Sequence, residues 1–249
     1  MITINNISKS YNSKVAVDQL NLQINPELFV FLGPNGAGKT TTIKLLTGLL
    51  RPDAGHIQLN GHDIQIEPLA AKRQFGYAPE TPALYEKLTP FEFVRLILAI
   101  YQIPTAIGVT RMEQLFDIFE LNDHQNSLIE ELSNGMKKKI SLIAALVHQP
   151  KILILDEPTV SLDPKAVRHL KEIMRGMVLR GSSVFMSTHI LEVAETMADR
   201  IGIIDHGKLA ALGTIEELRA SFHVDATLEE IFLRLTGEAS SQKIDEFLQ

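Results

Sequence analysis

The stretch FVFLGPNGAGKT, residues 29–40, decides the fold. Residues 29–33 form a short, continuous apolar run that ends in glycine, which indicates a β-strand buried on both faces. Residues 33–40 match the pattern G-x-x-x-x-G-K-[ST], and a helical pattern follows from Lys39 to about Leu49. Strand, glycine-rich loop and helix in this order predict a phosphate-binding loop between a sheet and a helix.

The residue types in this loop suit phosphate. Phosphate oxygens need several backbone N–H donors in one concavity, and Gly36 and Gly38 let the backbone come close because no Cβ intervenes. We expect Lys39 to reach the β- and γ-phosphates of a nucleotide and Thr40 to bind Mg²⁺. The alternative is a glycine turn that merely starts a helix. The residues expected to bind ATP here are Gly33, Pro34, Asn35, Gly36, Ala37, Gly38, Lys39, Thr40 and Thr41.

A second strand, in KILILDEP (residues 151–158), ends in the acidic pair Asp156 and Glu157. Two carboxylates at the end of a buried parallel strand are costly unless something uses them. Taken alone, the pair fits a strand end that meets solvent equally well. Beside a phosphate loop, the first acid is expected to hold Mg²⁺ and the second to orient or deprotonate the attacking water.

A third stretch, LSNGMKKK (residues 132–139), begins a helix with Ser133. Backbone N–H groups at a helix start, near Gly135 and a serine hydroxyl, again suit a phosphate. The alternative is a simple N-cap followed by a solvated face made by Lys137, Lys138 and Lys139. One chain need not bring this helix near its own phosphate loop, because the helix belongs to another part of the chain.

The order of patterns predicts an α/β fold, a P-loop NTPase core with a mixed sheet. Alternating apolar residues near the N-terminus indicate an antiparallel β subdomain, and residues 82–149 read as an inserted α-helical subdomain. The predicted ATPase domain spans 1–220, with its core at 1–81 and 150–220, and a C-terminal helical tail spans 221–249. Four capping boxes predict helix starts, at Thr89–Glu92, Thr110–Glu113, Thr214–Glu217 and Thr227–Glu230.

Composition narrows the functional classes. The 249 residues include no cysteine, which excludes disulfides, thiolate metal sites and cysteine nucleophiles. Lys and Arg number 24 against 30 Asp and Glu, a net charge of −6 that argues against a general nucleic-acid binder. No apolar run approaches the ~18 residues that a membrane span needs; the closest, from Phe91, contains Arg95.

Together these motifs resemble the ABC-type ATPases. LSNGM (residues 132–136) is similar to the signature motif LSGGQ of that family, and it precedes ILILDEP. The resemblance covers nearly the whole chain and implies that Tyr11 stacks on adenine. It also implies that PTVSLD is the D-loop, with Asp163 in its acidic position, and that His189 contacts the γ-phosphate. The implied catalytic residues are Glu157, His189 and Lys39.

In that family two ATPase domains pack head to tail around shared nucleotides. The resemblance therefore implies that Ser133 and Gly135 bind an ATP held mainly by a second ATPase, a copy of this chain or a paralogue. Two positions depart from the family pattern: Glu80 stands where Gln is usual, and Asn134 replaces the first signature glycine. A carboxylate at Glu80 can still approach Mg²⁺ or the attacking water, but it adds negative charge.

Three stretches resemble the ATPase subunits of ABC-2-type exporters: residues 76–89, SLDP at 161–164, and residues 227–237. The implied function is ATP-driven export through a separate transmembrane permease subunit, from the cytoplasmic face of the membrane and without nucleic acid. A groove near Glu80 to Leu98, with Phe91, Phe93 and Leu96 as candidate lining, would receive that subunit. Two alternatives stay open: a soluble ABC ATPase acting on nucleic acid or ribosomes, and an ATP-dependent regulatory dimerisation module.

Overall fold

A six-stranded sheet holds the strand that precedes the glycine-rich loop. The computed structural model describes residues 1–12, 14–222 and 226–237. The sheet consists of β3 (Leu28–Leu32), β6 (Phe75–Ala78), β7 (Ile152–Asp156), β8 (Ser183–Thr188), β9 (Arg200–Asp205) and β10 (Lys208–Gly213). Its strand order is β10-β9-β3-β8-β7-β6, in which only the β9–β10 pair is antiparallel. The predicted mixed sheet is therefore confirmed.

The centre of this sheet positions the two sequence motifs. Every residue of β3 and of β7 is buried, as the continuous apolar runs predict. Strand β8 lies between them, and its Ser187 pairs in register with Phe31 on one side and Asp156 on the other. The glycine-rich loop and the acidic pair therefore leave the sheet at the same edge, because the carboxyl ends of parallel strands meet there.

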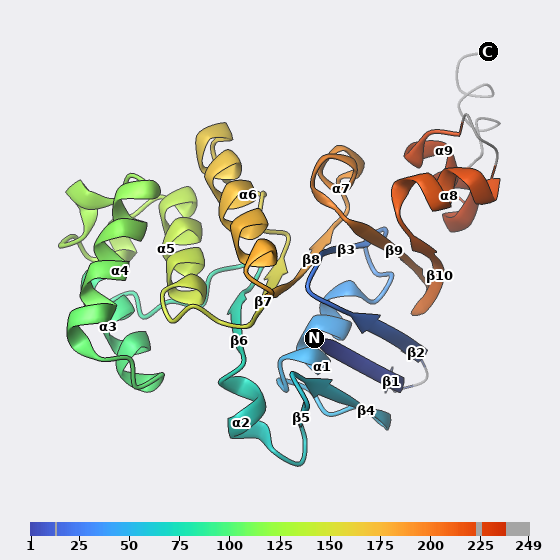
Figure 1. Cartoon of the computed structure of the whole chain (residues 1–249), viewed down its shortest axis with the longest axis horizontal. Coiled ribbons are helices and arrows are strands. Elements are labelled where there is room, and N and C mark those ends of the chain that lie inside the picture. The colour runs from blue at the N-terminus through green and yellow to red at the C-terminus, as the bar shows by residue number, and fades with distance from the viewer. Residues whose placement is uncertain (13, 223–225, 238–249) are drawn as a thin grey trace.

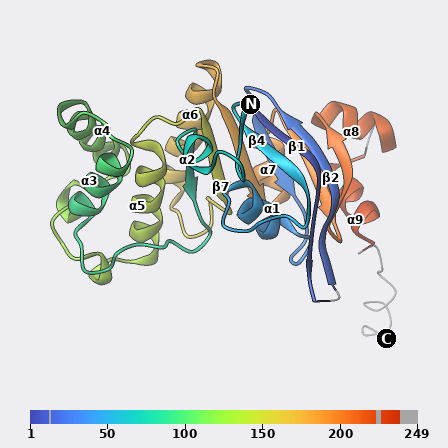
Figure 2. The same ribbon diagram turned by 90° about the horizontal axis from the view of Figure 1, so that it is seen from below.

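A smaller antiparallel sheet covers one face of the large sheet. It has the order β2-β1-β4-β5 and consists of β1 (Ile2–Tyr11), β2 (Lys14–Ile24), β4 (Ala54–Leu59) and β5 (His62–Asp63). Between the sheets, the inward side chains of β1, β2 and β4 share one apolar core with Phe29, Phe31 and Phe185 and with helix α1 (Lys39–Leu46). Figure 2 shows α1 beside the antiparallel strands.

Helices cover the other face of the large sheet and both ends of the molecule (Figure 1). Helices α6 (Pro164–Leu179) and α7 (Leu191–Met197) follow β7 and β8. At one end α3 (Pro90–Ile100), α4 (Thr105–Ile118) and α5 (Asn134–Leu146) lie together around Phe93, Met112, Phe116 and Ile140. At the opposite end lie α8 (Ile215–Phe222) and α9 (Leu228–Thr236), while the short α2 (Pro68–Lys72) precedes β6.

Three of the four predicted capping boxes are confirmed, and one is wrong. At Thr89, Thr214 and Thr227 the hydroxyl accepts from the N–H three residues on, and the glutamate there accepts from the threonine N–H. Thr110 instead lies inside α4, where its Oγ1 donates to Ala106 O at 3.1 Å. The helix begins at Thr105 instead, five residues earlier, with Pro104 at the N-cap position.

Other boundaries differ from the sequence analysis in smaller ways. Helix α1 ends at Leu46, three residues earlier than expected, and no helix covers residues 79–89 at the start of the predicted insert. Helix α8 crosses the predicted start of the tail at residue 221, and the last residues, 238–249, lie outside the described part of the chain. Within the described ranges, no helix is both long enough and apolar enough to cross a membrane.

Candidate active site

The glycine-rich loop connects β3 to the first turn of α1. Gly36 and Gly38 have φ angles of 81° and 111°, in the region that favours glycine. A Cβ on Gly38 would lie 2.4 Å from Ala16 O, so strand β2 also requires glycine there, whereas a Cβ on Gly36 would meet nothing within 4 Å. The loop therefore leaves open space at Gly36, directly before the N-terminus of a helix, where backbone N–H groups can hold an anion.

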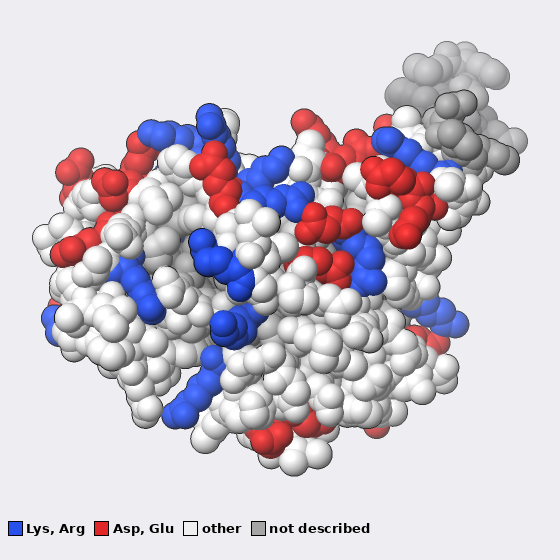
Figure 3. All heavy atoms as spheres, in the orientation of Figure 1, with Lys and Arg blue, Asp and Glu red and all other residues white. Residues whose placement is uncertain are grey.

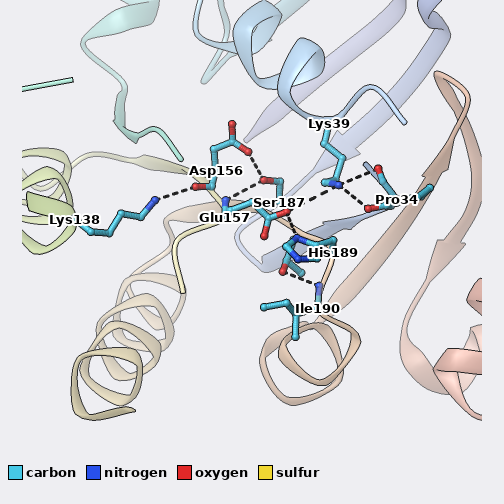
Figure 4. Close-up of polar contacts among 10 residues, drawn as sticks. Pro34, Lys39, Lys138, Asp156, Glu157, Ser187, His189 and Ile190 are labelled. Atoms are coloured by element: carbon cyan, nitrogen blue, oxygen red, sulfur yellow. Dashed lines mark hydrogen bonds and ion pairs between the residues drawn. The ribbon is translucent and has the colours of Figure 1, made fainter. Parts of the chain in front are cut away.

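Lys39, the first residue of α1, lies buried over its own loop. Its Nζ donates to Gly33 O at 2.6 Å and to Pro34 O at 3.1 Å, and Glu157 Oε1 is 4.0 Å away. Figure 4 shows the Lys39 side chain pointing between Pro34 and Glu157. Burial lowers the pKa of Lys39, and the nearby carboxylates oppose this shift. The ammonium group thus lies between the phosphate loop and the acidic pair.

The acidic pair is buried, so the alternative of a strand end that meets solvent is wrong. Asp156 is 2% exposed and Glu157 is 5% exposed. Ser187 on the neighbouring strand donates from Oγ to Asp156 Oδ1 at 2.6 Å, and the same Oγ accepts from Glu157 N at 3.2 Å. Glu157 has a φ of 45°, a backbone conformation that turns the chain away from the strand. One hydroxyl group therefore orients both acidic residues.

Glu157 also contacts His189, which follows β8. His189 Nδ1 lies 2.9 Å from Glu157 Oε1, while Glu157 Oε2 is buried and has no hydrogen-bond partner among the described residues (Figure 4). A buried carboxylate oxygen without a partner is costly unless a further group binds it. The arrangement therefore leaves one oxygen of Glu157 for a water molecule or a cation.

A cavity of about 330 Å³ brings most of the predicted site residues together. Its lining comes from both sheets, the glycine-rich loop and the loop after β6. The lining residues are Tyr11, Lys14, Ala16, Pro34, Asn35, Gly36, Gly38, Lys39, Thr40, Thr41, Glu80, Glu157 and His189. Gly33 and Ala37 lie buried beneath this lining, and Asp156 lies behind it at the strand end.

The predicted residues of the signature helix and the D-loop do not line this cavity. Ser133 caps α5 and accepts from Met136 N at 3.3 Å. Gly135 lies against the D-loop, since a Cβ there would be 2.9 Å from Ser161 O. Asp163 caps α6, and the Lys139 ammonium and the Ala166 N–H hold the pKa of Asp163 below its ordinary value. A role for these residues in nucleotide binding requires a second molecule and stays a prediction.

The lysine run after the signature residues is not a solvated face, so that expectation is wrong. Lys138 is only 2% exposed, and the side chains of Lys137 and Lys139 are 20% and 12% exposed. Lys137 pairs with Glu86 and Lys139 with Asp163. Three successive lysines are typical of an exposed helix face, but here all three side chains contact residues outside the helix.

Three further residues of the site were missed in the sequence analysis. Lys14 and Ala16 line the cavity from β2, and Ser187 binds the acidic pair from β8. The turn-favouring Asn12 directly after Tyr11 was the available sequence signal for the first two. Ser187 lies two residues before His189, and only the pairing of β7 with β8 shows that it faces Asp156.

Comparisons with known proteins agree with this geometry. A sequence profile of the family described as ABC transporter matches residues 17–160. The daunorubicin resistance ATP-binding protein DrrA3 of Streptomyces coeruleorubidus is 36% identical over 95% of this chain and 75% of its own. The ABC-type transporter ATP-binding protein EcsA of Bacillus subtilis is 35% identical over 96% of this chain and 97% of its own.

Solved structures give the same result. A structure described as the ATP-binding subunit of an ABC transporter superposes with a TM-score of 0.91 at 34% identity, over 94% of this chain and 99% of that chain. A dimeric ATP-binding cassette in a post-hydrolysis state, bound to ADP and Pi, has a TM-score of 0.79 over 86% of this chain and 98% of its own. Because the two sequences are only 24% identical, this similarity shows a shared fold and nothing further. This chain belongs to the ABC transporter family, as an ATP-binding subunit.

Proposed function

We propose that this chain is the ATP-hydrolysing subunit of an ABC exporter and drives translocation through a separate membrane-spanning subunit. The observation that carries the proposal is the cavity in which Lys39, Glu157 and His189 meet beside the glycine-rich loop. Relatives named for daunorubicin resistance, linearmycin resistance and Nod factor export support the export direction.

Glu157 fits the role of general base. His189 holds Oε1 of the carboxylate, and Oε2 remains for a water molecule. A water hydrogen-bonded to Oε2 would transfer its proton there as its oxygen attacks the γ-phosphorus. The other ring nitrogen of His189 is not needed for the contact with Glu157. In the imidazolium form, in which both ring nitrogens donate, it would donate to the γ-phosphate.

Lys39 and the acidic strand end fit a nucleotide bound with Mg²⁺. Phosphate oxygens would replace the carbonyl oxygens of Gly33 and Pro34 that now accept from Lys39. When bound, Mg²⁺ supplies positive charge to the phosphates and fixes their orientation. Thr40, Asp156 and Glu80 would hold it, and their oxygen atoms are the donors that this cation prefers. The buried, unpartnered Oε2 of Glu157 beside them fits a site that another group completes.

A second ATPase would complete each site. Ser133 and Gly135 lie at the exposed start of α5, outside the cavity of their own chain, and their N–H groups suit the phosphates of a nucleotide bound to another copy. Two solved structures of this fold are described as dimeric cassettes, which supports pairing of two copies. ATP would then join the two copies, and its hydrolysis would release them.

A second hollow, of about 410 Å³, supports docking of the membrane subunit. It lies between β6, α3 and α5, and its lining is mainly apolar: Thr47, Leu49, Lys72, Phe75, Tyr77, Pro79, Ala83, Leu84, Phe93, Ile97, Tyr101, Ser141, Ala144, Ala145 and His148. Of the three residues expected to line such a groove, Phe93 does so, whereas Phe91 and Leu96 lie outside the lining. Tyr85 packs edge-on against Phe93 and remains 64% exposed. An ABC-2-like permease at the cytoplasmic face of the membrane is the partner proposed for this hollow.

The two alternative functions have less support. A nucleic-acid or ribosome partner favours a basic surface, whereas this chain has a net charge of −6. Figure 3 shows acidic and basic side chains interspersed along the edge formed by α6 to α9. A regulatory module without turnover would not require the contact between Glu157 and His189.

The test is the molar mass of the Glu157→Gln variant in solution, measured by light scattering with and without Mg-ATP. We expect a monomer without nucleotide and a dimer with Mg-ATP, because the variant binds ATP but hydrolyses it slowly. Lys39→Ala is the matched control and should stay monomeric under both conditions. A Glu157→Gln protein that binds Mg-ATP and remains a monomer at all concentrations would exclude self-association and direct the search to a paralogous ATPase.

A further inference from the structure

Lys138 is a buried lysine that the proposed reaction does not use. It lies in the first turns of α5, five residues after the N-cap Ser133, and only 2% of its surface is exposed. Its Nζ donates to three backbone carbonyl oxygens: Pro79 O at 2.9 Å, Glu80 O at 2.9 Å and Asp156 O at 3.2 Å. Figure 4 shows the side chain extending from α5 toward Asp156.

The bonding capacity of this ammonium group is fully used. A lysine has three N–H donors, and here each can have its own carbonyl acceptor. Burying an ammonium group is unfavourable unless such partners are present. Burial lowers the pKa of Lys138 to about 8, while the carboxylates of Asp156, Glu80 and Glu157 oppose the shift.

The three acceptors belong to the two segments that bring carboxylates to the cavity. Pro79 and Glu80 begin the loop after β6, and Glu80 lines the cavity. Asp156 ends β7, and its carbonyl group belongs to the peptide bond that joins it to Glu157. A single side chain from the signature helix thus holds both segments, which are otherwise connected through the pairing of β6 with β7.

The charge of Lys138 also matches its surroundings. Asp156, Glu157 and Glu80 place three carboxylates near one another, and Lys39 is the other buried lysine beside them. Glu80 is the carboxylate that departs from the family pattern of glutamine. A positive charge at Lys138 offsets the additional negative charge on the side of the acids opposite Lys39 (Figure 4).

We propose that Lys138 is a positioning residue, which fixes the Glu80 loop and the end of β7 to the signature helix. In the dimer inferred above, on which this part rests, Ser133 and Gly135 contact the nucleotide of the second subunit. Any displacement of α5 on that contact would then move the Glu80 loop and the Asp156–Glu157 peptide bond together. Through Lys138, ATP hydrolysis at one nucleotide site would depend on the contact that α5 makes with the nucleotide of the second subunit.

The first test needs no nucleotide. The Glu157 N–H is shared between two acceptors, Ser187 Oγ at 3.2 Å and Ser187 O at 3.3 Å. Its peptide bond includes the Asp156 carbonyl that accepts from Lys138. We expect Lys138→Met to accelerate hydrogen–deuterium exchange of the Glu157 amide by at least about fivefold, because local opening governs exchange. Lys137→Met is the matched control, since its partner Glu86 lies farther along the loop, and it should leave this amide unchanged.

The second test is kinetic. Lys138→Met should retain ATP affinity within about threefold, because Lys138 does not line the cavity, while kcat falls by at least about tenfold. Lys138→Arg, which keeps the charge and the donors, should recover kcat to within about threefold of the wild type. Lys137→Met should hydrolyse ATP at the wild-type rate. If Lys138→Met does not fold, Lys138→Gln, which keeps two donors without the charge, replaces it in both tests.

A double-mutant cycle separates positioning through Glu80 from a general loss of stability. If Lys138 acts through the Glu80 loop, Glu80→Gln should change kcat by a different factor in the Lys138→Met background than in the wild type. Equal factors, together with unchanged exchange of the Glu157 amide, would overturn the proposal. A different result would separate the two proposals. If the wild type has no ATPase activity but Lys138→Met still accelerates exchange of the Glu157 amide, the proposed function is refuted. The role of Lys138 in holding the Glu80 loop and the end of β7 then remains.

Discussion

At the scale of single residues, the Ser187 hydroxyl determines how the acidic pair is held. It donates to Asp156 and accepts from the Glu157 N–H, so the two residues with different chemical roles share one anchor. Ser187 is fully buried, and water therefore cannot replace it without rearrangement. The same hydrogen bond leaves the second oxygen of Asp156 on the side away from Ser187.

The Ser187→Ala variant should lose activity and stability together. Removing the hydroxyl leaves the buried Asp156 Oδ1 without its donor, which costs about 1–3 kcal/mol in the free energy of unfolding. We expect kcat to fall by at least about tenfold, because even a small displacement of a reacting group raises the activation free energy. The control is Ser183→Ala on the same strand, since the Ser183 Oγ is buried and has no hydrogen-bond partner among the described residues. Comparable losses in the two variants would contradict the role given to Ser187.

The Glu157→Gln variant tests the base itself. The amide keeps the size of the side chain and its contact with His189, but it cannot accept a proton. We expect the ATP affinity to stay within a few-fold and kcat to fall by about 10²–10⁴. Steady-state turnover near the wild-type level, in a protein that binds ATP normally, would exclude Glu157 as the base.

Residue chemistry explains which parts of the site were predictable. Lys39, Asp156, Glu157 and His189 stand in local motifs whose spacing determines their position, and the structure brings them together. Ser187 and Lys138 could not be predicted in this way. The partner of Ser187 lies 31 residues away along the chain, and those of Lys138 lie 18, 58 and 59 residues away. These contacts therefore depend on strand pairing and helix packing rather than on local sequence.

At the scale of elements, a pair of stacked rings lies where α3 and α5 meet β6; its histidine is buried and its tyrosine half-buried. Tyr101, at the end of α3, stacks on His148, just after α5, with ring centroids 3.7 Å apart. The Tyr101 hydroxyl donates to Phe75 O, and His148 Nε2 lies 3.3 Å from the same oxygen. The pair therefore joins the helical insert to the edge of the large sheet.

The pH dependence of stability should report this ring pair. Burial lowers the pKa of His148 from its ordinary 6.5 to about 4, although the Phe75 and Ala144 carbonyls oppose the shift. Between these two values the unfolded chain binds a proton that the folded chain does not, so folding stability falls as the pH falls. The loss from this group is about 3 kcal/mol when the pH reaches 4 and is absent above the ordinary pKa.

The variant that tests it is His148→Phe, which keeps a ring against Tyr101 but cannot be protonated. Because the Tyr101 hydroxyl still donates to Phe75 O, we expect stability at pH 7.5 to change little. Between about pH 7 and pH 4.5 the melting temperature of the variant should fall less than that of the wild type. The exposed His124 supplies the control, and His124→Asn should follow the wild-type profile. Parallel profiles for His148→Phe and the wild type would show that His148 does not carry this pH dependence.

Helix starts show where local reasoning about elements succeeds and fails. Thr89 and Thr110 both stand three residues before a glutamate, yet only Thr89 caps a helix. Pro90 follows Thr89 and favours a helix start there, whereas Thr110 has an unbroken helical pattern before it. A capping pattern thus identifies a helix start only when the preceding residues cannot continue a helix.

At the scale of the whole molecule, one copy does not bring all the residues of the proposed site together. Tyr11, the glycine-rich loop, Glu157 and His189 share the cavity, whereas Ser133 and Gly135 begin a helix that does not line it. Sequence motifs predicted both sets of residues but could not place them relative to each other, because in the proposed dimer that geometry depends on a second molecule. The division predicts a specific behaviour when two inactive variants are mixed.

Lys39→Ala damages the phosphate-loop half, and Ser133→Arg damages the signature half by placing a large side chain at the start of α5. In a head-to-tail dimer, each site combines the phosphate loop of one copy with the signature helix of the other. In a dimer of one copy of each variant, one site therefore contains both substitutions and the other contains neither. Lys39→Ala alone should stay monomeric, and Ser133→Arg should block its own pairing, so the mixed dimer is the expected species. Because it has one intact site of two, an equimolar mixture should recover up to about half of the wild-type ATPase activity per chain. The control mixture is Lys39→Ala with Glu157→Gln. Both of these lesions lie in the same half, so every mixed dimer has two damaged sites and should stay inactive.

Recovery in the first mixture alone would establish that each ATP is shared between copies. Equal inactivity of both mixtures, with each variant folded, would mean that a single copy or a different second ATPase completes the site.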